Sequence, residues 1–467
     1  MKTSSRKAPN SEASVLVVTL VITLILGVML ASYFGLVQAQ SRSVARSQLW
    51  NNAMIVAEAG VEDGLQFLNK YIGTPYLTAW SAVYSADGWS RPGGGNVYKL
   101  TRYMNADHSI YYTVYVTNVN NAPVIRASGY VPAPAWAAGG QPISRTVVVR
   151  TRIDAMFNVC MAALGTIDLK GNGVASDSYD SSDLAYSTNG LYIKSKRKAG
   201  GDIVTNNTIT NSVLNIGNAN VAGHVTTGPN GTIQQGPNDT VGDLAWVDAN
   251  TPGIKPGWSG NDLNVVFNNV VLPNVSWFTA SGVGTGGSGT APDGKSYDHI
   301  FTSPFDTMIS PGNYTVSDDG DIYVGTNVFV RLNITASDFN PDKIFVAGVT
   351  TNEAGKLVGY LNGPMGQSVT LGTDDKTQSG RPVNLMFLGT TNCTSLSYKG
   401  NGDFTGVIYA PQADFHLAGG GSSSVDFCGS SVTRTVQMNG HYKFHYDENL
   451  RNVGPNNGYV TTSWKEY

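Results

Sequence analysis

Two short aspartate clusters have the residue types of a cation site. The first contains Asp177, Asp180 and Asp183 in DSYDSSD, and the second contains Asp318, Asp319 and Asp321 in SDDGDIYV. Carboxylate oxygens on a loop are the ligands that Ca²⁺ prefers. Neither cluster has the ligand spacing of an EF-hand loop, and aspartates that hydrogen-bond their own turns give the same pattern. Both readings stay open for the candidate ligands Asp177, Asp180, Asp318, Asp319 and Asp321, and no other cofactor is expected.

His441 and His445 form the one histidine cluster of the chain, and two carboxylates follow them. On a helix the two imidazoles could share Zn²⁺, whereas on a strand residues four apart lie about 13 Å from each other. Aromatic residues alternate with the histidines and favour a strand. The cluster therefore indicates a structural role, in which HYDENL closes the end of a β domain and Tyr446 and Leu450 are buried.

A polysaccharide hydrolase or lyase would need paired carboxylates that converge on a cleft. Asp403, Asp414 and Asp426 are separated widely enough in the sequence to lie on different strands. No Ser/His/Asp or Cys/His catalytic motif accompanies them. The sequence predicts a protein that is not an enzyme.

Three cysteines, Cys160, Cys393 and Cys428, are too few for a disulfide scaffold. Cys393 and Cys428 both lie in strand-like segments. Outside the cytoplasm they could form a disulfide and leave Cys160 free. Two buried thiols on neighbouring strands are the alternative.

The composition indicates a β-rich, turn-rich, exported protein. Charged residues make up 13% of the 467 residues, 54 are glycine, and 41% are hydrophobic. That hydrophobic content excludes disorder, and the low charge excludes a coiled coil. A net charge of −3 gives no reason to expect a nucleic-acid partner.

An apolar run from Ala13 to Ala39 is long enough to cross a membrane as a helix. No charged residue occurs between Glu12 and Arg42, and the basic leader, residues 1–13, places the N-terminus in the cytoplasm. The span, about 14–38, is too long for the apolar core of a cleaved signal peptide. The sequence thus predicts a single-pass protein of the bacterial inner membrane, with the body outside the cytoplasm.

The helix is expected to continue beyond the membrane. Apolar residues recur there at steps of three and four, namely Trp50, Ala53, Ala57, Val61, Leu65 and Leu68. The sequence predicts one helix over residues 14–72, about 85 Å long at 1.5 Å per residue, whose second half is amphipathic.

The rest of the chain alternates with period two. Four alternating segments between Gly95 and Phe157 predict an antiparallel meander that packs on the helix, which makes residues 73–157 a small α+β domain. Residues 158–452 contain many short strands closed by Gly and Asn turns, which favours an irregular parallel β-solenoid over a β-sandwich. Residues 453–467 are expected to be a C-terminal tail.

The N-terminal region resembles type IV pilins and pseudopilins with a PilX-type N-terminal domain. The resemblance rests on the basic leader, the span SVLVVTLVITLILGVMLASYFGLVQAQSRSVARSQ and the later VAEAGVEDGLQFL. It implies prepilin-type cleavage between Ala13 and Ser14 and assembly with other pilins. The family's glutamate at the fifth mature position is replaced by Val18, as in members at a filament tip.

Residues 160–452 resemble a domain of unknown function found behind pilin-like N-termini in bacterial surface proteins. The matching segments include GDFTGVIYAPQADFHLAGGG and MNGHYKFHYDENL. The resemblance transfers no catalytic residue.

Together these features predict a minor or tip pilin that displays a large β domain for adhesion to surface glycans or proteins. The alternatives are a membrane-anchored envelope protein that never enters a filament and, less favoured, a polysaccharide-active enzyme.

Overall fold

The structure is a computed structural model of the chain. It describes residues 11–70, 81–94, 96–119, 122–134, 136, 140–171, 173–206, 213–308, 310–336, 339–348, 353–362, 368–370, 377–378, 380–398, 402–418, 425–439, 441–454 and 456–467. The chain forms two compact units. The helix–sheet unit contains residues 1–152 and 459–467, and the large β unit contains residues 153–458.

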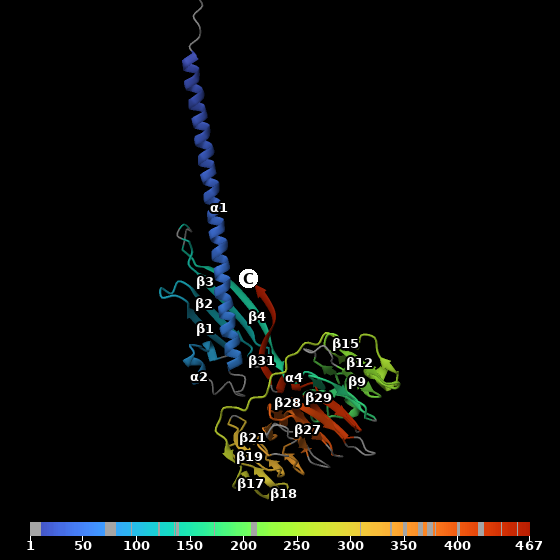
Figure 1. The fold of residues 1–467 in the computed structure, drawn as a ribbon. Coiled ribbons are helices and arrows are strands. Elements are labelled where there is room, and N and C mark those ends of the chain that lie inside the picture. Colours follow the sequence, from blue (N-terminus) through green and yellow to red (C-terminus); the bar gives the residue numbers. More distant parts are fainter. Residues whose placement is uncertain are drawn as a thin grey trace, which may run out of the picture. The chain divides into compact units, whose positions relative to one another are not determined.

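A single long helix, α1 (Ser11–Lys70), begins the helix–sheet unit (Figure 1). By length and composition its apolar first part could cross a membrane, and none of that stretch is buried in the structure. The predicted helix through the span and beyond it is confirmed.

The second half of α1 packs on a five-stranded sheet. The strand order is β1 (Val97–Tyr103), β2 (Tyr111–Thr117), β3 (Val124–Val131), β4 (Ile143–Ala155) and β31 (Asn456–Glu466). The predicted antiparallel meander is confirmed for β1 to β4. Two short helical segments precede it, α2 (Ser81–Ala86) and η2 (Pro92–Gly94).

The apolar residues of the second half of α1 are buried against the sheet as predicted, with the exception of Trp50. Ala53, Ala57, Val61 and Leu68 are buried against the sheet, and Leu65 is partly buried. Trp50 was expected in this core but is 46% exposed, because its ring instead stacks under the Arg145 guanidinium, 4.9 Å from the ring centroid. A cation–π contact with Arg145 on β4 thus replaces burial.

The last strand of the chain belongs to the first sheet. Residues 453–467, expected to be a tail, contain β31 instead, which lies next to β4. Thr146 and Tyr467 exchange backbone hydrogen bonds of 3.3 and 2.8 Å. The open edge of β4 is therefore paired by a strand that follows the whole large β unit in the sequence, which no local pattern specifies.

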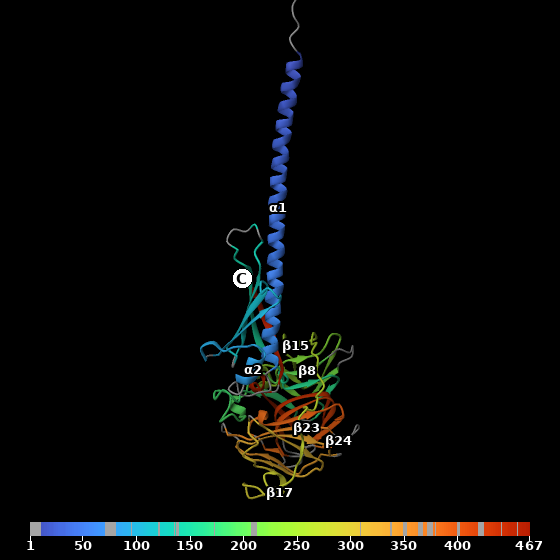
Figure 2. The same ribbon diagram turned by 90° about the vertical axis from the view of Figure 1, so that its left-hand side faces the viewer.

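The large β unit has one sheet of 21 strands and one of five (Figures 1 and 2). The strands of the larger sheet are β5 (Met161–Ala163), β6 (Ile167–Asp168), β7 (Ala175–Tyr179), β8 (Ile203–Thr205), β9 (Val213–Gly217), β10 (Asn220–Ala222), β11 (Val225–Thr226), β12 (Thr232–Gln235), β13 (Thr240–Gly242), β14 (Gly253–Ile254), β15 (Ser259–Gly260), β16 (Phe278–Thr279), β19 (Gly312–Val316), β21 (Phe329–Ile334), β23 (Lys356–Leu361), β24 (Ser368–Thr370), β26 (Leu385–Gly389), β27 (Ser395–Tyr398), β28 (Phe404–Leu417), β29 (Val425–Met438) and β30 (Tyr442–Asp447). Those of the smaller sheet are β17 (Thr285–Thr290), β18 (Ser296–Phe301), β20 (Ile322–Val324), β22 (Ile344–Val346) and β25 (Thr377–Gln378). The helical segments are η3 (Lys194–Lys196), α3 (Leu244–Asp248), η4 (Pro382–Asn384) and α4 (Leu450–Val453).

Parallel pairing dominates this unit. Among the strand pairs whose register is described here, β17–β18 alone is antiparallel, and the long strands β28, β29 and β30 pair in parallel. The expectation of a mainly β body after the helix is confirmed. A solenoid is not shown, because the sheets do not close around a continuous coil.

Helix and sheet approach each other closely at Gly129 on β3. A Cβ atom at this position would lie 2.2 Å from the Ala53 carbonyl oxygen and 2.4 Å from the Ala57 nitrogen, both backbone atoms of α1. Backbone cannot move aside as a flexible side chain can, so the contact requires glycine.

We expect Gly129→Ala to lower the free energy of unfolding by about 1–3 kcal/mol, the usual cost of overpacking a core. Gly35→Ala is the matched control, because no atom lies within 4 Å of a Cβ there. Urea unfolding of the detergent-solubilised chain, followed by near-ultraviolet circular dichroism, measures both. Equal stability of the two variants would contradict the close approach.

Candidate functional site

Parallel register places polar residues in one row across four strands of the large β unit. Thr405 on β28 pairs with Cys428 on β29, Cys428 pairs with His445 on β30, and His445 pairs with Asp177 on β7. Strand β7 comes from the beginning of the unit and the other three strands come from its end. The row therefore joins the two ends of the unit's sequence.

His445 is the centre of this row. Its Nδ1 lies 2.6 Å from Asp177 Oδ1, and its Nε2 lies 3.4 Å from Asp426 Oδ1. The second contact is within ion-pair range but lacks the geometry of a hydrogen bond, so Nε2 is a buried polar atom without a hydrogen-bond partner. The side chain of His445 is only 4% exposed.

Tyr192 and Arg197 complete the cluster from the loop that follows β7. The Tyr192 ring stacks on the imidazole of His445 with a centroid separation of 3.6 Å, and its hydroxyl donates to Asp177 Oδ2 at 2.9 Å. Arg197 Nε lies 3.7 Å from the same oxygen, and its guanidinium also pairs with Asp248. Asp177 thus has three positive or donating neighbours.

These contacts set the protonation of the cluster. Burial alone would lower the pKa of His445, but the polar contacts and charges of Asp177 and Asp426 outweigh burial and raise that pKa. The neighbouring imidazole in turn lowers the pKa of Asp426. The geometry therefore favours an imidazolium held between two carboxylates.

A cavity of about 430 Å³ opens beside this cluster. The outward faces of β7, β10 and β30 form one side, and the loop at Tyr192–Arg197 and helix α3 form the other. A second cavity of about 190 Å³ shares Tyr192 and contains Asp403, Asp426 and Cys428.

The structure brings together some of the predicted carboxylates and separates others. Asp403 and Asp426 are neighbours, since the Asp426 amide donates to Asp403 Oδ1 at 2.9 Å. Asp414 belongs to another part of β28, where it pairs with Arg434. Asp403 and Asp426 therefore line one cavity, and Asp426 Oδ1 also lies 3.4 Å from His445 Nε2.

The two candidate calcium clusters have protein partners. Asp180 accepts from the Ser182 amide at 2.9 Å, and Asp183 from the Ala185 amide at 2.8 Å, as turn aspartates do. In the second cluster Asp318 contacts His299 Nε2 at 2.6 Å, Asp321 accepts from the Lys343 amide at 2.7 Å, and Asp319 is exposed. Among the residues that the structure describes, no three His, Cys, Asp or Glu side chains are arranged to hold a metal.

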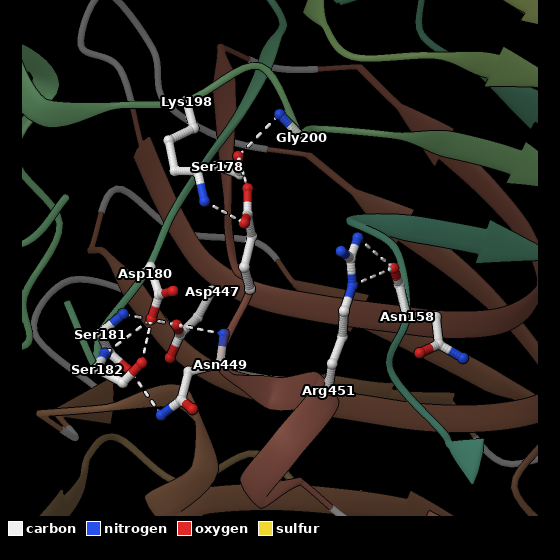
Figure 3. A network of polar contacts seen from close by, with 11 residues as sticks. Asn158, Ser178, Asp180, Ser181, Ser182, Lys198, Gly200, Asp447, Asn449 and Arg451 are labelled. Carbon is white, nitrogen blue, oxygen red and sulfur yellow. Dashed lines mark hydrogen bonds and ion pairs between the residues drawn. The ribbon is translucent and has the colours of Figure 1, made fainter. Parts of the chain in front are cut away.

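A polar network next to the cluster joins the end of the unit to its beginning (Figure 3). Buried Asp447 accepts from the amides of Ser181 and Asn449 at 2.9 and 3.1 Å, and burial raises its pKa to about 6. Arg451 donates to the Asn158 carbonyl. Tyr446 and Leu450 are fully buried, as predicted for HYDENL.

His441, in contrast to His445, lies outside β30, and the two do not converge. The strand predicted for this segment is confirmed. Sequence reasoning missed Tyr192 and Arg197, because they lie in an irregular loop and carry no spacing motif. Their roles follow from the fold alone.

The cysteines are free thiols in the structure, so the suggested Cys393–Cys428 disulfide is absent. Cys393 belongs to the hydrophobic core, whereas Cys428 lines the outward cavity. Cys428 lies on β29, whereas Cys393 precedes β27, and the two side chains have different surroundings.

The cleavage candidates Ala13 and Ser14 lie in the first turn of α1. Val18, at the position of the expected glutamate, is 53% exposed. The large apolar side chains of residues 15–37 are exposed throughout.

Part of the large β unit matches a family without an assigned function. Residues 285–453 match a family described as a domain of unknown function (DUF7305). No curated protein matches the chain. Among solved structures, the competence-associated pilin ComZ from Thermus thermophilus is similar at 11% identity and a TM-score of 0.29, covering 90% of this chain and 97% of ComZ. A TM-score of 0.29 does not establish that the two chains share a fold.

His445→Gln should destabilise the large β unit by about 3 kcal/mol, because it leaves two carboxylates beside each other without the imidazolium. The raised pKa of His445 means that its charge stabilises the folded chain fully below about pH 6.5, and that this contribution is lost as the pH rises through the folded-state pKa. The stability difference from the wild type should therefore be larger at pH 6 than at pH 9.

Denaturant unfolding at the two pH values measures this effect. His416→Gln, a substitution on β28 away from the carboxylate pair, is the matched control. A His445→Gln difference that is equal at both pH values would show that the imidazole is neutral.

Alkylation should distinguish free from paired cysteines. Burial raises the pKa of Cys393 to about 12 and raises that of Cys160, so neither thiol should react with iodoacetamide in the folded chain. After unfolding without reductant, mass spectrometry should show all three cysteines alkylated. Modification of Cys160 alone would instead show that Cys393 and Cys428 are bridged.

Proposed function

We propose that the chain is a pilin-like minor or tip component of a type IV pilus or pseudopilus that displays the large β unit. The observation that carries this proposal is the construction of α1. Its first part is apolar and exposed, and its second part packs on a meander. An ordinary membrane anchor has no need for a rigid extension packed on its own sheet.

Two features favour a minor or tip role over a role as the repeating subunit. The large β unit accounts for most of a 49.5 kDa chain, which would crowd a filament shaft. Val18 also replaces the glutamate expected from the resemblance to pilins, so the pairing of that carboxylate with a neighbouring subunit's terminal amine is not available. A terminal subunit has fewer neighbours to satisfy.

The displayed unit is proposed to bind rather than to catalyse. The carboxylates nearest to a catalytic pair, Asp403 and Asp426, are held by hydrogen bonds and by His445. The body is proposed to lie outside the cytoplasm, anchored in the inner membrane before assembly and exposed on the cell surface afterwards, with other pilins as partners.

A double charge substitution tests the assembly role. Leu20→Lys together with Leu24→Lys places two ammonium groups in the apolar run, at a cost of about 2.5–3.5 kcal/mol each near the membrane centre. The variant should disappear from sheared filaments. Ile55→Lys, also on the exposed side of α1 but beyond the apolar run, should be retained.

The mature N-terminus separates assembly from simple anchoring. Under the proposal, sequencing of the filament fraction should start at Ser14 or a near neighbour, and gold-labelled antibody should mark filament ends. A protein confined to the membrane with residue 1 intact would support the envelope-anchor alternative and contradict the proposal.

A further inference from the structure

We propose that the 430 Å³ cavity beside His445 binds a carboxylate-bearing sugar of the uronic acid class. The cavity lies on the outward face of parallel strands and is covered by the Tyr192–Arg197 segment and by α3. Ligand cavities commonly measure roughly 300–1,000 Å³, so its size suits one or two sugar rings.

Charge favours an acidic ligand. Lys194, Arg197 and Lys443 line the cavity together with His445. Asp177 is satisfied by His445 and Tyr192, and Asp248 pairs with Arg197.

Lys194 and Lys443 are the two cationic lining residues that are not paired with a carboxylate in this way. In the part of the chain that the structure describes, neither forms an ion pair within 4 Å, although Asp426 lies opposite Lys443 in the adjacent strand. Even with Asp426 included, positive groups exceed negative ones when His445 is protonated. Two lysines lining one cavity are suited to binding a carboxylate.

The remaining lining favours a sugar over a bare anion. Asn220, Asn250 and the exposed carboxylate of Asp248 offer donors and acceptors for hydroxyl groups. Ala175, Ala222 and Val247 provide small apolar surface for the C–H face of a ring. This mixture of a few polar groups on an apolar floor is typical of small-molecule sites.

The buried imidazole of His445 is a second sign of a built site. Its Nε2 lies at ion-pair distance, 3.4 Å, from Asp426 Oδ1 without the geometry of a hydrogen bond, and burying a charged imidazole between carboxylates costs free energy. Its imidazole is stacked under Tyr192, and the same tyrosine forms part of the cavity wall. Binding beside Tyr192 would reinforce the arrangement that holds His445.

Calorimetric titration of the full-length chain tests the proposal, in a detergent without a sugar headgroup. D-Galacturonate and D-glucuronate are the probes, methyl galactoside is the neutral comparison, and inorganic phosphate is the anion without a sugar. At least one uronate should bind, and the neutral sugar should not. Lys194→Gln with Lys443→Gln should weaken uronate binding at least tenfold, whereas the exposed Lys295→Gln should leave it unchanged.

Absence of uronate binding, or equal affinity in the double-lysine variant, would overturn the proposal. Binding of phosphate without binding of either uronate would overturn the sugar assignment. A melting temperature of the double variant equal to that of the wild type excludes unfolding as the cause of lost binding. The titration uses isolated chains, so its result is independent of whether the chain enters a filament.

Discussion

The large β unit depends on the in-register parallel pairing of β28, β29, β30 and β7. Because side chains alternate along a strand, one register sets both faces of the sheet. On the inner face Phe404, Phe427 and Phe444 stack with centroid separations of 4.5 and 4.4 Å. On the outer face the same register aligns Cys428, His445 and Asp177. A slip by one residue would bury the polar row and expose the phenyl rings.

The polar cluster exists only when both ends of the large β unit are folded together. Asp177 comes from the first strands of the unit, whereas Asp426 and His445 come from its last strands. Placing a charged imidazole in a nearly dry site costs free energy that only its partners and their hydrogen bonds recover. Asp447 and Glu448 reinforce the same junction, since Ser178 donates to Glu448 at 2.8 Å and Lys198 pairs with it. These polar contacts therefore form only when the first and last strands of the large β unit are both in place.

The sequence predicted those features that local periodicity controls. The continuous helix, the four-stranded meander and the strand at His445 all follow from patterns within one element or between neighbouring elements. Trp50 fits the helical stripe but is half exposed, and its ring contacts the guanidinium of Arg145 on β4, which the spacing within the helix does not reveal.

Features that depend on distant pairing could not be predicted in the same way. Asp403, Asp426 and His445 were recognised singly as candidates, but nothing in their spacing shows that Asp177 lies beside them. The pairing of β31 with β4 has the same cause. Tyr192 was missed altogether, because a stacking tyrosine in a loop is indistinguishable from any other tyrosine until the ring beneath it is known.

The pairing of β31 has a mechanical consequence. The chain leaves the helix–sheet unit within β4 and returns to it within β31, and these two strands are neighbours in one sheet. The large β unit is therefore held by two covalent connections instead of one. A pulling force on the large β unit would be divided between two hydrogen-bonded strands, both of which belong to the sheet that packs on α1. Both ends of the large β unit are thus covalently joined to neighbouring strands of one sheet.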